Sequence, residues 1–192
     1  MGCELTKNNV VVPEMPEEDV TVFSDTQIDT IRSTWPLLSR DGVRVGVEVF
    51  MRIFRETPSI RRLFESLGSK DIDNLQHYPV FQDHALKFMK VLESLVQNME
   101  DPEVIQPHLV ALGVRHAAID GYHPEYFRVY SKCLLEVWEM ELGEEFISEV
   151  KECWKHVIKY IVRYMVHGYD MCLTDQLENV MTDCNFEKLD YT

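Results

Sequence analysis

The chain has 192 residues, 45% of them hydrophobic and 10% aromatic, with a formal net charge of −14. This length and composition fit one soluble globular domain with a sizeable core, and they exclude a largely disordered chain. The acidic balance argues against nucleic acid as a partner, because phosphates attract basic surfaces. No apolar run is long enough to span a membrane as a helix.

The acidic charge is concentrated at the two ends of the chain. Residues 1–23 carry a net charge of −4 and residues 170–192 a net charge of −5. We therefore expect an acidic N-terminal tether, a folded domain over 24–169, and an acidic, flexible C-terminal tail. The first twenty residues lack the apolar core of a secretory signal, so the five cysteines are expected to be reduced.

The first six residues, Met-Gly-Cys-Glu-Leu-Thr, match the pattern for myristoylation of Gly2. One myristoyl chain binds a membrane only weakly, and an acidic leader cannot add a polybasic signal. Cys3 is then the expected second site, carrying palmitate. The sequence predicts dual acylation and a location at the cytoplasmic face of a membrane, with the plasma membrane expected; the alternative is a chance match in a disordered leader.

The folded part opens with a capping box, Ser24-Asp-Thr-Gln27, ahead of an apolar-periodic first helix. Pro36 is expected to bend this helix or loosen its last turn. A second helix is predicted over 42–56, with Gly42 and Gly46 on a face where another helix can approach closely.

The second helix is predicted to end before Pro58, which begins a short turn toward Phe64. The next helix, about 78–98, carries a histidine on a stripe of helical spacing: His84, Lys87, Phe88, Val91 and Leu95. Taken alone, His84 is typical of a partly exposed histidine at the edge of a core.

A shorter helix ending near residue 118 carries His116 on its apolar side. A lone histidine in such a place is usually a hydrogen-bonded core residue. A long helix over about 125–142 follows, Gly143 breaks it, and a last helix is predicted from about residue 144 to Tyr169. We find no convincing strand pattern.

Residues 24–169 resemble an animal globin, motif by motif. The segment from Thr57-Pro58 to Phe64 resembles the turn that leads to the phenylalanine stacked on haem in nearly all globins. Residues 81–89 resemble the distal helix of the family, which places His84 as the distal histidine.

The segment Leu-Gly-Val-Arg-His at 112–116 resembles the proximal helix, with His116 as the iron ligand. Tyr126-Phe127 and Trp154 also fall where the family has aromatic residues. His116 lies 32 positions after His84, a spacing similar to that of neuroglobin and cytoglobin.

The acidic leader with Gly2-Cys3 resembles that of globin X, a membrane-bound animal globin. The resemblance implies an all-α globin fold, with seven to eight helices around a pocket for haem b and flexible tails. It also implies His84 as a second iron ligand, small ligands such as O₂, NO, nitrite or CO, and a reductase or electron donor as partner. Besides the two histidines, it places these residues around the haem: Phe50, Phe64, Lys87, Phe88, Leu112, Tyr122 and Phe127.

Several residues depart from the usual globin pattern. Phe88 stands where most globins have valine, and Phe50 where leucine is common, so we expect a crowded, dry distal side. Arg115 stands where a small residue is common, and it either pairs with a haem propionate or points to solvent. The same two alternatives hold for Lys87.

Three functional hypotheses follow. The first is a lipid-anchored haem protein with two axial histidines, acting in electron transfer, in nitrite or NO chemistry, or in protection from oxidants. The second is a reversible O₂ store or carrier with five-coordinate ferrous haem. The third is a helical adaptor without haem. The globin fold alone does not choose among the reactions of haem.

Overall fold

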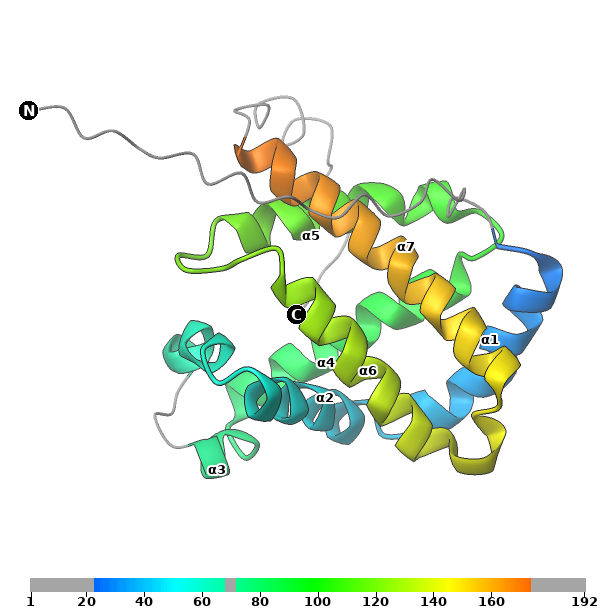
Figure 1. The fold of residues 1–192 in the computed structure, drawn as a ribbon, viewed down its shortest axis with the longest axis horizontal. Coiled ribbons are helices and arrows are strands. Elements are labelled where there is room, and N and C mark those ends of the chain that lie inside the picture. The colour runs from blue at the N-terminus through cyan, green and yellow to red at the C-terminus, as the bar shows by residue number, and fades with distance from the viewer. Residues whose placement is uncertain (1–22, 68–71, 174–192) are drawn as a thin grey trace, which may run out of the picture.

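The computed structural model describes residues 23–67 and 72–173, and within them the protein is all-α (Figure 1). This confirms the fold class expected from the sequence. The described part contains seven α-helices and three short 3₁₀ helices: α1 (Asp25–Ser39), α2 (Gly42–Glu56), η1 (Ile60–Leu67), α3 (Ile72–Leu75), α4 (Pro79–Gln97), η2 (Pro102–Val104), α5 (Gln106–Ala117), α6 (Tyr126–Leu142), η3 (Gly143–Glu145) and α7 (Ser148–Leu173).

Helix α1 begins at the predicted capping box. The side chain of Ser24 accepts a hydrogen bond from the Gln27 N–H at 3.3 Å, and the Gln27 side-chain oxygen accepts one from the Ser24 N–H at 2.9 Å. Pro36 does not end the helix, which continues through it. Trp35, just before this proline, and Leu38, two residues after it, are both buried, so the last turn of α1 is packed into the core.

Helices α2 and α4 meet at the glycine face predicted from the sequence. A Cβ atom added to Gly46 would lie 2.6 Å from the carbonyl oxygen of Ala85 on α4. Gly42 makes only ordinary contact, since its added Cβ would lie 3.6 Å from the Cβ of Met89. The close approach at Gly46 therefore fixes the position of α4 at Ala85, the residue next to His84.

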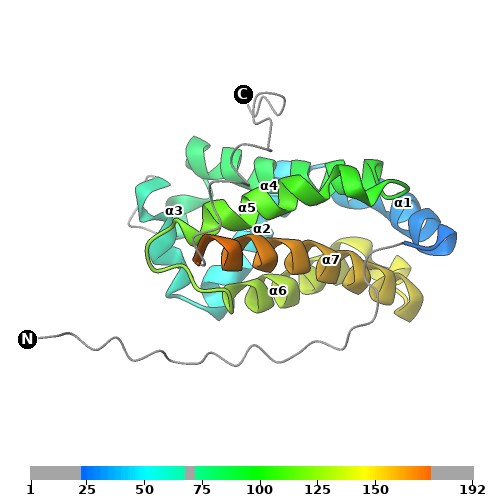
Figure 2. The same ribbon diagram turned by 90° about the horizontal axis from the view of Figure 1, so that it is seen from above.

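Helices α5 and α7 lie side by side in both views (Figures 1 and 2). They meet at two glycines that the sequence analysis did not single out. An added Cβ at Gly113 of α5 would overlap the backbone of α7 at Met165. One at Gly168 of α7 would overlap the backbone of α5 at Val110. Because only glycine fits at both points, this crossing holds α5 at a fixed distance from α7.

The last helix differs from the sequence prediction at both ends. Gly143 adopts a positive φ of 54° and opens the 3₁₀ helix η3, so α7 begins at Ser148 rather than near residue 144. At its other end, α7 continues past Tyr169 to Leu173. Tyr169 is buried and its hydroxyl donates a hydrogen bond to the carbonyl oxygen of Tyr122 at 3.0 Å, which ties this end of α7 to the α5–α6 connection.

The core is built from the apolar faces of these helices. Trp154 on α7 donates its indole N–H to the Thr34 hydroxyl at 3.1 Å and packs edge-on against Trp138 at 5.6 Å between ring centroids. Cys133 and Cys153 are buried free thiols, as expected for small core side chains. Among the described helices, none combines the length and the apolar character needed to cross a bilayer.

Candidate functional site

Two histidines, His84 on α4 and His116 on α5, lie within electrostatic reach of each other inside the protein. The pKa of His84 is lowered to about 4, first by burial and then by the positive charges of His116 and Lys87. Burial also lowers the pKa of His116. Both imidazoles are therefore neutral near pH 7, and the neutral ring is the form that binds a metal ion.

The ring of His116 is oriented by its own helix. Its Nδ1 lies 2.7 Å from the carbonyl oxygen of Leu112, one turn earlier on α5. Since a carbonyl oxygen only accepts, Nδ1 carries the proton and Nε2 of the neutral ring keeps a lone pair. The rings of Tyr122 and Phe127 contact the imidazole, at 5.0 and 6.2 Å between centroids.

The imidazole of His84 lies among phenylalanine rings that come from three different elements. Phe50 of α2 and Phe64 of η1 approach it at 5.0 and 5.2 Å. Phe88, one turn further along α4, stands edge-on to Phe50 at 5.5 Å. The tertiary structure thus brings together Phe50 and Phe88, the two phenylalanines from which the sequence predicted a crowded site.

These side chains share one region of the protein interior. Burial is the main cause of the lowered pKa values of His84 and His116 and of the raised pKa values of Tyr122 and Tyr130. We call this region the interior site, lined by His84, His116, Phe50, Phe64, Phe88, Leu112, Tyr122 and Tyr130.

Residues 47–165, which include both histidines, match the Globin family. The chain belongs to this family. Cytoglobin-2 of Oryzias latipes is 26% identical over 148 residues, which cover 77% of this chain and 83% of that protein. Neuroglobin-1 of Oncorhynchus mykiss is also 26% identical over 148 residues, covering 77% of this globin and 92% of the relative.

The fold is similar to a solved structure as well. The crystal structure of a hexacoordinated haem protein from an anhydrobiotic tardigrade, at pH 4, superposes with a TM-score of 0.71 at 21% sequence identity. The match covers 77% of this globin and 96% of the tardigrade chain. At this identity the likeness establishes the fold of the chain.

Membership of the globin family implies haem, and the interior site of this globin fits it. Haem iron is held by a neutral imidazole, and the porphyrin needs apolar walls. His116 offers the lone pair of Nε2, and rings of Phe50, Phe64 and Phe88 line the side of His84. The structure thus combines a candidate iron ligand with aromatic walls.

The residues predicted to touch haem fall into three groups. The two histidines and the residues Phe50, Phe64, Phe88, Leu112, Tyr122 and Phe127 come together around the interior site. Lys87 instead pairs with Asp83 at 2.9 Å, and Arg115 is exposed on α5. Their contacts with a propionate stay predictions. Gly2 and Cys3 lie outside the described residues.

Tyr130 is a site residue that sequence reasoning missed. It lies three positions after Phe127 on α6, a spacing that indicates the same buried face. That periodicity predicted a core side chain. Only the fold shows that its ring packs against Phe88 of α4, one turn after His84.

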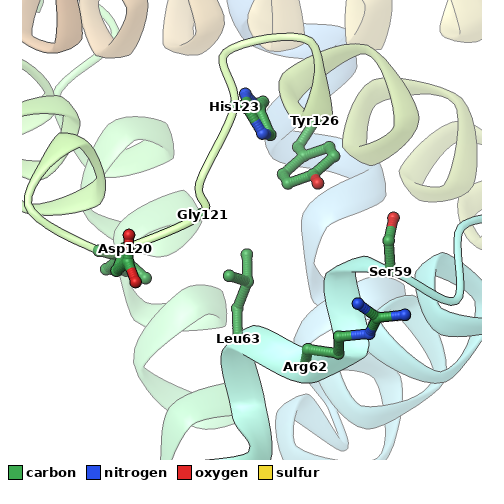
Figure 3. A pocket seen from close by; sticks show the side chains of 8 residues that line it. Ser59, Arg62, Leu63, Asp120, Gly121, His123 and Tyr126 are labelled. Carbon is green, nitrogen blue, oxygen red and sulfur yellow. The ribbon is translucent and has the colours of Figure 1, made fainter. Parts of the chain in front are cut away.

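A hollow of about 550 Å³, which we call the outer hollow, opens between η1 and the α5–α6 connection (Figure 3). Arg62 and Leu63 line one side of it, and Asp120, His123 and Tyr126 line the other. Neither iron-ligand candidate lines this outer hollow. It is separated from the interior site by aromatic packing, since the Tyr126 ring contacts Tyr122 at 5.5 Å and Tyr122 contacts His116.

The low pKa of His84 predicts how the stability of the haem-free protein depends on pH. An unfolded histidine titrates near 6.5 and the folded one near 4, so between these values the unfolded chain binds more protons. The free energy of unfolding should therefore fall as the pH is lowered from about 6.5 to 4, by at most about 3 kcal/mol from this group. Urea unfolding at several pH values measures the slope, and His84→Leu should flatten it; an equal slope in both proteins would contradict the assignment.

Proposed function

We propose that this globin binds haem with both histidines as axial ligands of the iron. The observation that carries the proposal is the placement of His84 against Phe50 and Phe64 and of His116 against Tyr122, within electrostatic reach of each other. His116 is the permanent ligand because the Leu112 carbonyl fixes its ring. His84 makes no hydrogen bond to a described side chain or backbone group, so it is the ligand that can leave.

The relatives support this coordination. The tardigrade protein of similar fold is a hexacoordinated haem protein, and we extend that coordination to this chain. The matches to cytoglobin and neuroglobin agree with the 32-residue spacing of the histidines.

Bound haem supplies reversible binding of O₂, NO and CO, together with one-electron chemistry with ligands such as nitrite. His84 on the iron competes with these ligands and lowers their apparent affinity by the fraction of molecules in which it has left. Once off the iron, His84 can donate a hydrogen bond to the ligand. The rings of Phe50 and Phe88 keep water away from that side.

This arrangement favours a redox role over O₂ storage. A store gains from an open coordination position, whereas His84 closes it. We therefore infer electron transfer, NO or nitrite chemistry, or removal of oxidants, supported by a reductase or another electron donor.

We further propose that the protein acts at the cytoplasmic face of the plasma membrane, as a relative of globin X. The support is the myristoylation pattern at Gly2 with Cys3 beside it and the acidic leader. Two lipids together give stable attachment, which one myristoyl chain does not.

The absorption spectrum of the deoxygenated ferrous protein tests the coordination. Two axial histidines should produce split, sharp visible bands. One broad visible band would show five-coordinate iron, would overturn the proposed coordination, and would favour reversible O₂ binding instead.

Membrane attachment is tested by Gly2→Ala in cells. The variant cannot be myristoylated, so it should move from the membrane fraction to the soluble fraction. Cys3→Ser should keep only the weak, reversible attachment of one myristoyl chain, which repeated washing removes. Retention of Gly2→Ala in the membrane fraction, at the level of the unaltered protein, would contradict the acylation.

A further inference from the structure

The ring of Tyr130 lies at the His84 end of the interior site. It stands edge-on to Phe88 at 5.6 Å between centroids. Phe88 follows His84 by one turn on α4, and the Phe50 ring contacts both of them. Tyr130 thus reaches the site from α6, in contact with Phe88 and within electrostatic range of Tyr122.

The hydroxyl of Tyr130 has no hydrogen-bond partner among the described residues. Tyr160 and Tyr169 do have partners, since Tyr160 donates to the carbonyl oxygen of Pro102 at 2.8 Å and Tyr169 to that of Tyr122 at 3.0 Å. The Tyr122 hydroxyl, against His116, also has no partner among the described residues. Burial raises the pKa of Tyr130, so its hydroxyl keeps its proton. The hydroxyl is therefore a donor that is free to form a hydrogen bond with a small molecule in the site.

We propose that the Tyr130 hydroxyl donates a hydrogen bond to a small ligand held on the His84 side of the interior site. The inference rests on the proposed haem binding, which supplies the place for such a ligand. Tyr130 is a specificity-determining residue in this view. It favours ligands whose outer atom accepts a hydrogen bond well, such as O₂, over weak acceptors such as CO.

Tyr130 and His84 differ in when they can act. An imidazole bound to iron cannot donate to an external ligand until it has left, and it must then stay close by. Tyr130 needs no such movement, because its ring is held by Phe88 on α4. It therefore supplies a donor that does not depend on the position of His84.

Tyr130→Phe tests the proposal in the full-length, haem-loaded protein, because it removes the hydroxyl and keeps the ring. Loss of one hydrogen bond should make O₂ dissociate about fivefold faster, with little change for CO. The infrared stretching band of bound CO should also move to higher frequency. Tyr126→Phe is the matched control, one turn earlier on α6 at the outer hollow, and should change neither quantity.

His84→Leu separates the two donors. In this background Tyr130→Phe should still shift the CO band, and transfer of His84→Leu from H₂O to D₂O should shift the band through the Tyr130 hydroxyl alone. Unchanged O₂ dissociation together with an unmoved CO band would overturn the proposal for Tyr130. The proposed function would still stand if the visible spectrum of the deoxygenated ferrous protein showed two axial histidines. Failure of the unaltered protein to bind haem would overturn both.

Discussion

Replacement of His84 by leucine is expected to leave haem bound and to accelerate CO binding on the order of 100-fold, if His84 occupies the iron in about 99% of molecules. Leucine fills the space among Phe50 and Phe64 without a lone pair, so no internal ligand competes for the iron. Rapid mixing of the ferrous protein with CO measures the rate. The visible bands of the deoxygenated variant should merge into one.

Two other histidine variants complete this test. His77→Leu is the matched control, because His77 is exposed just before α4 and should leave the CO rate unchanged. His116→Leu should lose tight haem binding, since the oriented imidazole is removed. An unchanged CO rate in His84→Leu, or firm haem retention in His116→Leu, would contradict the assigned roles.

Gly168→Ala is expected to destabilise the protein by about 3 kcal/mol and to speed the loss of haem. The added methyl group would overlap the α5 backbone at Val110, so α5 and α7 must separate. Because α5 carries His116, this separation should also displace the proposed iron ligand. Urea unfolding measures the first effect, and transfer of haem to an excess of a haem-scavenging protein measures the second.

Gly42→Ala is the control: it is the same substitution on another helix, α2, where the added Cβ overlaps no backbone. Its added Cβ meets the Met89 side chain at an ordinary distance of 3.6 Å, and alanine is the better helix former. We expect a free energy of unfolding equal to that of the unaltered protein or higher by up to about 1 kcal/mol. Equal stability of the two alanine variants would show that the α5–α7 crossing tolerates a side chain.

Local signals in the sequence were sufficient for most helices. The capping box at Ser24, the stop before Pro58 and the break at Gly143 all act through the backbone of a few neighbouring residues, and the structure follows them. The same signals did not locate the ends of α7. Its start depends on the 3₁₀ turn after Gly143, and its last turns depend on the contact of Tyr169 with Tyr122, which is distant in sequence.

The candidate site was only partly predictable. His84 and His116 were found because each stands on a patterned helix and the globin resemblance links them. Lys87 shows the limit of such reasoning, because a charged residue at the edge of a stripe has several possible partners. The structure pairs it with Asp83 on the same helix.

The sequence by itself determined the helical class and the glycine face of α2, and it placed the two candidate histidines on helices. Hydrophobic periodicity and capping residues suffice for this because they act over one or two turns. Only the tertiary structure decided what each buried face meets. It placed Gly113 against the backbone of α7, Gly168 against the backbone of α5, and Tyr130 at the interior site. Periodicity shows that a side chain points inward, but the packing of helices distant in sequence decides which residues it contacts.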